Sequence, residues 1–243
     1  MPAPGIRNLL FRGGAKTYSQ RVLATGPIAY WPLWEPSGTV ITDISGNGRN
    51  GAYSGATPPT LGVSGIGDGR TAASFPGATA YGNVYSVGLR DAFNGAVGSM
   101  IVWVKPAADV WTDGSVDGWF WIATADGQNA IYVRKSATNA TIEWRVLAGN
   151  VGAVRAKAGQ STVGWLCLAL TWNGSTYQAY YNGVAEGAAV ATGTWAGLPA
   201  SNSMNVGASS TVPASVANGT LAHVALWNRA LSPAEVLSFA SPL

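Results

Sequence analysis

Residues 26–53 read GPIAYWPLWEPSGTVITDISGNGRNGAY, and the order of elements in this stretch decides the fold. Two short apolar segments, Ile28–Leu33 and Val40–Ile44, are separated by a turn at residues 35–38. They are followed by residues 45–51, which contain three glycines and two asparagines. Gly and Asn tolerate positive φ angles, so this run predicts a tightly turned loop in place of a helix or strand.

Short apolar segments separated by turn signals continue along the rest of the chain. Tyr177–Tyr181 leads into Asn182-Gly183, a two-residue hairpin signal. No β-α-β alternation interrupts the pattern, and regularly spaced short strands of this kind predict an all-β sandwich or jelly roll. The other strand candidates are Ala73–Gly77, Tyr81–Val87, Ser99–Pro106, Trp119–Ala123, Ala130–Lys135, Ile142–Leu147, Trp165–Trp172 and Met204–Ala208.

Two capping boxes indicate a short helix near each end of the chain. Thr17 is followed three residues later by Gln20, and Ser232 is followed in the same way by Glu235. Pro233 stands at the first position of the second helix, where its missing N–H costs nothing. The predicted helices cover about residues 17–24 and residues 233–239.

Six motifs of this chain resemble, in the same order, those of laminin-G-like domains in the concanavalin A-like lectin/glucanase superfamily. The resemblance covers nearly all of residues 26–240 and implies a concanavalin A-like β-sandwich jelly roll over residues 26–243. Residues 1–25 lie outside it and are interpreted as an extended N-terminal arm with a short helix that anchors the protein. The motifs are the opening loop 43–51, the strands 73–77, 99–106 and 204–208, the hairpin 165–183 and the closing stretch 219–232.

The N-terminal arm is basic and contains an apolar segment. Four of the 14 basic residues and none of the 11 acidic residues lie within residues 1–25, so the remainder is nearly neutral. A basic arm of this size favours an acidic patch on a protein partner, because nucleic acid usually requires a larger basic face. The residues predicted to make this contact are Arg7, Leu9, Leu10, Phe11 and Arg12.

The sequence lacks the residue patterns of a hydrolase. Glucanase members of the superfamily carry paired carboxylates on one strand, whereas the four glutamates of this chain each stand apart from other acids. Glu143, beside Arg145, is expected on a solvated face or in an ion pair. His223 has no accompanying nucleophile motif, and Cys167 lies in an apolar run typical of a buried, inert thiol. The sequence therefore predicts a protein that is not an enzyme.

The opening loop is the candidate metal site. The resemblance implies a structural calcium ion near it, with Asp43 and Asn47 as ligands, because carboxylate and carbonyl oxygens suit a hard cation. The family's closing Asp-Glu pair is replaced here by Ala222 and His223, which removes negative charge. The alternative is that Asp43 caps its own turn, as Asp commonly does.

A loop between two predicted strands is the candidate glycan-binding site. Trp111, Asp113, Asp117 and Trp119 combine aromatic rings for stacking on a sugar with carboxylates for its hydroxyls. The alternative is that both tryptophans cover the edges of the sandwich or contact another protein, since Trp is also an interface anchor.

Three observations lead to a functional hypothesis of a virion surface protein. The N-terminus has no apolar run of signal-peptide length, and no segment is apolar enough to span a membrane. Such lectin-like domains normally work outside cells, and the basic arm fits docking onto other capsid or tail proteins. We therefore expect a phage protein made in the host cytoplasm, a capsid decoration or tail module, with a free carbohydrate-binding lectin as the alternative. Charged residues are only 10% of the chain, which fits homo-oligomeric assembly or an ordinary low-charge β protein.

Overall fold

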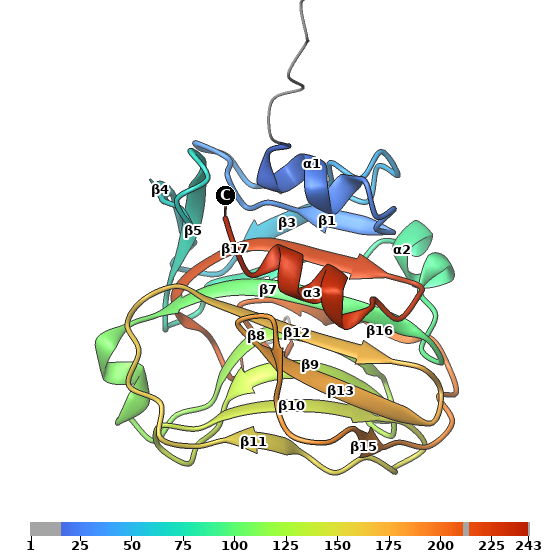
Figure 1. The fold of residues 1–243 in the computed structure, drawn as a ribbon. Helices are drawn as coiled ribbons and strands as arrows, with labels where there is room; N and C mark the ends of the chain where they lie inside the picture. The colour runs from blue at the N-terminus through green and yellow to red at the C-terminus, as the bar shows by residue number, and fades with distance from the viewer. Residues whose placement is uncertain (1–15, 211–213, 243) are drawn as a thin grey trace, which may run out of the picture.

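Two antiparallel β-sheets face each other in the structure, a computed structural model that describes residues 16–210 and 214–242. Helices α1 (Tyr18–Leu23) and α3 (Pro233–Phe239) lie together on the outer side of one sheet (Figure 1). The predicted all-β sandwich of jelly-roll type, with short helices near both ends, is confirmed.

Each sheet is a continuous antiparallel array within the described residues. The first sheet has the order β14 (Val184–Ala185), β13 (Thr176–Tyr181), β12 (Leu166–Trp172), β7 (Gly98–Pro106), β17 (Asn218–Trp227), β5 (Thr71–Pro76) and β4 (Thr60–Ser64), with β1 (Ala29–Trp31) on β17 and β15 (Val190–Ala191) on β13. The second sheet has the order β11 (Arg155–Lys157), β10 (Ile142–Leu147), β9 (Ala130–Lys135), β8 (Asp117–Thr124), β16 (Pro199–Val206), β6 (Tyr81–Asn83), β3 (Gly51–Ser54) and β2 (Val40–Ile41).

Strand β7 shows how the alternation of side chains divides the molecule into two cores. Met100, Val102 and Val104 belong to the core between the sheets, whereas Ile101 and Trp103 belong to a second core on the other face of the strand. Because both faces are covered, every residue from Gly98 to Val104 is buried. The sequence of this strand is therefore continuously apolar from Met100 to Val104 and does not alternate there.

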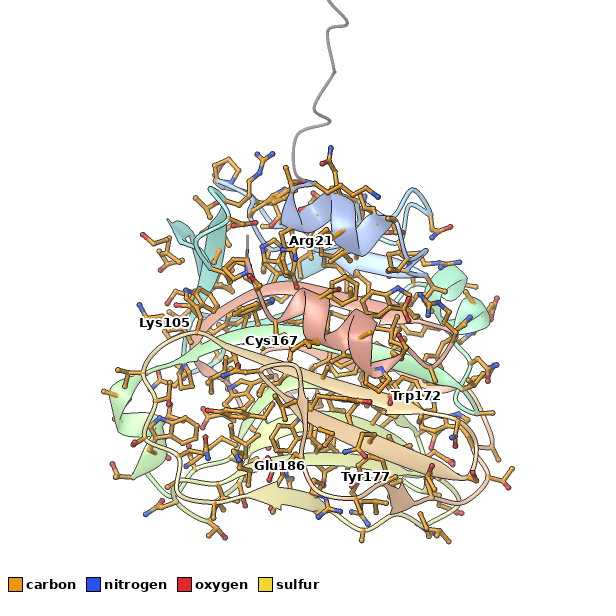
Figure 2. The ribbon with its side chains drawn as sticks, in the orientation of Figure 1. Arg21, Lys105, Cys167, Trp172, Tyr177 and Glu186 are labelled. Carbon is orange, nitrogen blue, oxygen red and sulfur yellow. The ribbon has the colours of Figure 1, made fainter. Side chains whose placement is uncertain are left out.

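The second core lies between the outer side of the first sheet and helices α1 and α3. Tyr18 and Val22 of α1 are fully buried there, and Phe239 of α3 stacks on Trp227 of β17 with ring centroids 5.8 Å apart. Cys167 lies beneath α3 (Figure 2), where burial raises the pKa of its thiol, so the expected inert character fits its position.

Both predicted capping boxes form. Thr17 Oγ1 accepts from the Gln20 backbone N–H at 3.3 Å, and the Gln20 side chain accepts from Thr17 N–H at 3.0 Å. The Ser232 and Glu235 pair is equivalent, with Ser232 N–H donating to the Glu235 carboxylate at 2.8 Å. These reciprocal bonds satisfy N–H groups that a helix start leaves without partners.

Helix α1 is packed into the body of the sandwich. Besides its buried side chains, Tyr18 Oη accepts from Trp103 Nε1 at 2.8 Å, and Arg21 donates to the carbonyls of Ser238 and Ser241 at 2.6 and 2.5 Å. Arg21 thereby ties α1 to the C-terminal end of α3 (Figure 2). The division placed after residue 25 from the sequence thus falls inside one packed unit. The predicted contact residues of the arm, at positions 7 and 9–12, lie outside the described residues.

One strand prediction was wrong in part. The segment 81–87 forms β6 only as far as Asn83, and helix α2 (Val87–Ala92) begins after the three residues 84–86. The cause is Ser86, whose Oγ accepts from the backbone N–H of Leu89 at 3.0 Å and so caps the helix.

Candidate functional site

A cavity of about 460 Å³ opens where three loops meet at one end of the sandwich. One loop leads from the 3-10 turn η1 (Ala108–Trp111) into β8, the second precedes β17, and the third follows β5. A cavity of this size matches small-ligand sites in proteins. It is lined by Gly77, Asp113, Ser115, Val116, Asp117, Ser215, Val216 and Asn218.

Asp113 is held at the cavity by a buried lysine. Its Oδ1 lies 2.5 Å from Nζ of Lys135, whose side chain is fully buried, and the same Nζ donates to the Ser115 carbonyl at 2.9 Å. Burial alone would raise the pKa of Asp113, but hydrogen bonds from Lys135 and Ser115 outweigh it, so the pKa lies below its ordinary value. Asp113 therefore stays ionised at neutral pH.

Asp117, two residues after Ser115, has a different environment. Only 1% of its surface is exposed, its Oδ1 accepts from the Asn218 backbone N–H at 2.9 Å, and its Oδ2 lies 3.3 Å from Ser115 Oγ. Burial, reinforced by the negative charge of Asp113, raises the pKa of Asp117 to about 6. No ion pair with Asp117 forms among the residues that the structure describes.

The cavity wall suits a small polyhydroxylated ligand. Carboxylates, serine hydroxyls and the Asn218 amide supply donors and acceptors, while Val116 and Val216 supply apolar surface. The Asn218 side-chain amide is held by the Asp109 carboxylate, with Nδ2 donating at 3.1 Å.

Two of the four predicted glycan-binding residues, Trp111 and Trp119, are buried and present no ring face to a sugar in the cavity. Trp111 is 4% exposed and donates from Nε1 to the Thr162 carbonyl at 2.8 Å, and Trp119 has no exposed surface. Their rings meet edge to face with centroids 6.5 Å apart. A ring that stacks on a sugar must present a free face, so the expectation for these two tryptophans is corrected: they support the loop from the core, and only Asp113 and Asp117 line the cavity.

A stacked aromatic pair lies elsewhere, on the outer side of the second sheet, where Trp121 is partly exposed and Tyr132 is 3% exposed. Trp121 of β8 and Tyr132 of β9 stack in parallel, with centroids 4.5 Å apart and planes 6° apart, and the Arg134 guanidinium lies 4.6 Å from the Tyr132 ring. Arg134 also pairs with Glu143 at 2.7 Å, across the strands β9 and β10. The ion pair predicted for Glu143 thus forms. Its partner is Arg134 on the adjacent strand and not Arg145, the residue close to it in the sequence.

The opening loop places hydrogen-bond donors where a calcium ion would need oxygen ligands. Asp43 Oδ1 accepts from the backbone N–H groups of Tyr30 and Ser45 at 3.0 and 2.9 Å. Its Oδ2 accepts from Ser45 Oγ at 2.9 Å and from the Arg49 N–H at 2.8 Å. The carboxylate therefore has four donors, which fits the expectation that Asp43 caps its own turn.

The other groups of this loop also do not fit a calcium site. Asn47 turns its Nδ2 toward the Ile28 carbonyl at 3.1 Å, and Arg49 Nη1 donates to the same carbonyl. A guanidinium and an amide N–H thus occupy the position next to this oxygen, and both repel a cation. In the described ranges no group of three or more His, Cys, Asp or Glu side chains could hold a metal ion. The donor set of Asp43 and Asn47 therefore does not fit the expected calcium.

His223, which the sequence left without a role, joins four segments under α1. Its Nδ1 lies 2.7 Å from Tyr30 Oη, its Nε2 lies 3.1 Å from Asp68 Oδ2, and its ring packs against Tyr18 with centroids 4.5 Å apart. Burial lowers the pKa of His223, although Asp68 opposes this, so the imidazole is neutral at pH 7. This network holds α1 against the sheet. The sequence did not predict it, because Asp68 lies in a glycine-rich loop far along the chain from His223.

The facing antiparallel sheets with a polar cavity at their end define a lectin-like β-sandwich. The chain belongs to the family Laminin_G_3, described as Concanavalin A-like lectin/glucanases superfamily, whose model matches residues 76–237. A search of curated proteins found no match. Among the residues that the structure describes, no helix has the length and apolar character that crossing a membrane requires.

Solved structures with this fold include both enzymes and binding domains. Domain 4 of a GH43 extracellular arabinanase from Geobacillus stearothermophilus, in complex with arabinotriose, matches with a TM-score of 0.57 and 17% identity over 88% of this chain and 98% of that one. The binding domain of botulinum neurotoxin serotype D matches with a TM-score of 0.60 and 13% identity over 88% and 51%. Trypanosoma rangeli sialidase matches with a TM-score of 0.59 and 14% identity over 89% and 32%. The chain thus spans nearly all of the arabinanase domain, about half of the neurotoxin binding domain and about a third of the sialidase, and these identities show a shared fold alone.

Proposed function

We propose that this protein is a non-catalytic carbohydrate-binding protein that holds a saccharide in the cavity between residues 113–117 and 215–218. The observation that carries the proposal is the lining of the cavity, where carboxylate, hydroxyl and amide groups surround a space of about 460 Å³. Membership of a lectin/glucanase superfamily supports it, as does the arabinanase domain of the same fold with its bound arabinotriose.

The surroundings of the two carboxylates support binding without hydrolysis. Hydrolysis of a glycosidic bond usually requires two carboxyl groups that flank the bond, one to give a proton and one to attack or activate water. Asp113 is tied to Lys135, and Asp117 is 1% exposed and already accepts from Asn218 and Ser115. Ser115 Oγ lies 2.7 Å from the Asp113 carboxylate and 3.3 Å from that of Asp117, so the two carboxylates lie side by side and do not flank a bond from opposite sides.

A glycan array with a cavity-filling variant tests this proposal. Val216→Trp places an indole in the cavity, and Val184→Trp, on the exposed edge strand β14, is the matched control. We expect the full chain and the control to bind at least one glycan class and Val216→Trp to lose that binding. Absence of any bound glycan would overturn the carbohydrate-binding proposal. Binding that survives in Val216→Trp and disappears in Trp121→Ala would move the site to the outer face of the second sheet.

We further propose that the protein works on a virion surface, attached through residues 1–15. The support is the charge of the N-terminal segment and the firm connection of α1, which Arg21 ties to the end of α3. A segment joined to such a helix transmits its attachment directly to the body.

The test is attachment to particles by a variant that lacks residues 1–15 and keeps α1. Removing α1 as well would expose the second core and confuse loss of attachment with loss of folding, since Tyr18 and Val22 are buried there. Undiminished attachment of the shorter deletion would show that the arm is not the anchor.

A further inference from the structure

We propose that the cavity selects saccharides that carry a free amino group, with the sugar's ammonium balancing the charge of Asp117. This inference rests on the saccharide-binding function proposed above and names the class of sugar that the same site takes.

The first argument is the charge balance at the cavity. Asp113 and Asp117 both line it, and Lys135 is the cation that the structure places beside them. Lys135 gives its Nζ to Asp113 and to the Ser115 carbonyl, so one negative charge remains without a partner. An ionised carboxylate shielded from water and lacking a cation is unfavourable, and a cationic ligand relieves that cost.

The second argument is that Asp117 forms no ion pair with Lys135, although the strand register places the two residues opposite each other. Asp117 and Lys135 are directly opposite each other in the pairing of β8 with β9, the arrangement in which a cross-strand ion pair is expected. Lys135 instead reaches the loop residue Asp113 at 2.5 Å. Lys135 thus forms its ion pair with Asp113, and Asp117 lines the cavity without an ion pair of its own, although the charge of Lys135 lowers the pKa of Asp117 in part.

The remaining groups around Asp117 are suited to an ammonium ion. Asp117 receives one backbone N–H and one longer contact from Ser115 Oγ, so its oxygens keep unused acceptor sites. Serine hydroxyls of Ser115 and Ser215 line the same cavity and can accept the other protons of an ammonium group. A ligand charge in this partly buried site interacts with Asp117 more strongly than it would in water.

The same charge balance disfavours acidic sugars. A sialic or uronic acid would bring a third carboxylate next to Asp113 and Asp117, and like charges in a desolvated site repel. Neutral sugars would bind through hydroxyls alone. The expected order of affinity is therefore amino sugar, then neutral sugar, then acidic sugar.

Calorimetric titration of the full chain with four probes measures this order. The probes are glucosamine, N-acetylglucosamine, glucose and glucuronic acid at pH 7, with calcium chloride as a cation that is not a sugar. We expect glucosamine to bind at least about tenfold more tightly than glucose or N-acetylglucosamine, as charge-assisted hydrogen bonds do. Asp117→Asn should abolish this difference without lowering the melting temperature, and the exposed Asp91→Asn should preserve it.

A second measurement separates Asp117 from the titration of the amine itself. When the pH falls from 7 to 5, a larger fraction of the sugar amine is protonated, which by itself would strengthen binding. Asp117 takes up a proton over the same range because burial raises its pKa to about 6, so we expect glucosamine binding to weaken.

Each outcome decides between distinct possibilities. Equal affinity for glucosamine and glucose, with both lost in Val216→Trp, would overturn the selectivity and leave the carbohydrate-binding proposal standing. Binding of none of these probes together with an empty glycan array would overturn both. Calcium binding that Asp117→Asn removes would show a metal site in place of an amino-sugar site.

Discussion

Two loops of this protein begin with the same Asp-x-Ser turn, but the rest of the fold supplies their carboxylates with different hydrogen-bond donors and cations. In each, an aspartate is followed two residues later by a serine that donates from both its N–H and its Oγ to the carboxylate, Ser45 to Asp43 and Ser115 to Asp113. Asp43 then receives two further N–H groups from nearby backbone. Asp113 receives Lys135 from another strand, and the next acid, Asp117, receives no cation among the described residues.

The difference shows that an Asp-x-Ser turn does not by itself make a carboxylate structural or functional. What decides is whether the rest of the fold brings enough donors to the oxygens. The opening loop has enough and closes on itself. The loop at the cavity has one donor cation for two carboxylates, and it is the one with a space for a ligand.

The largest effect is expected from Asp43→Ala, which removes the acceptor for four donors. At about 1 kcal/mol for each hydrogen bond, the loss is about 4 kcal/mol in the free energy of unfolding, measured by urea denaturation. Asp113→Ala, in the more exposed loop, is the comparison and should cost less, because its side chain is 27% exposed. Equal losses would mean that the two turns do not differ as described.

Lys135→Met should be next in size. It removes the cation from a fully buried position and leaves Asp113 and Asp117 facing each other, with an expected loss of about 3 kcal/mol at pH 7. The loss should shrink as the pH falls and the carboxylates become protonated. Lys105→Met, on an exposed position of β7, is the control and should change stability little. A pH-independent loss would contradict the electrostatic origin.

Asp117→Asn should stabilise the protein at neutral pH. The pKa of Asp117 is raised to about 6, so the folded state binds its proton more tightly than the unfolded state, whose pKa is near 3.8. The ionised residue therefore costs stability above pH 6, and the cost disappears as the pH falls through about 6 toward 4. We expect the variant to gain about 3 kcal/mol at pH 7 over the parent chain and to match it near pH 4. A gain that stays constant with pH would exclude this explanation.

Arg49→Ala should have the smallest effect, about 1 kcal/mol, because it removes one side-chain hydrogen bond to the Ile28 carbonyl and keeps the backbone N–H that binds Asp43. Neither calcium chloride nor a chelator should change the melting temperature of the parent chain. A rise in melting temperature with calcium that persists in Asp117→Asn would contradict the assignment of this loop as closed by its own donors.

Local sequence signals predicted the elements well and the contacts between them less well. The capping boxes at Thr17 and Ser232 were sufficient for both terminal helices because their partners lie three residues away. The Ser86 cap was missed because the apolar run before it continued the strand pattern. For Trp111 and Trp119, residue type indicated a stacking role, but burial depends on how η1 and β8 pack against the core.

The sequence by itself determined the all-β sandwich, the starts of the two terminal helices and the places where the chain turns, because these depend on residues close together in the chain. Only the tertiary structure decided which aspartate faces a ligand space. The donors that make the difference come from far away: Lys135 lies 22 residues from Asp113, and the N–H that Asp117 accepts comes from Asn218, 101 residues further along. The charge of a site is a sum over neighbours in space, and the sequence alone does not state which neighbours those are.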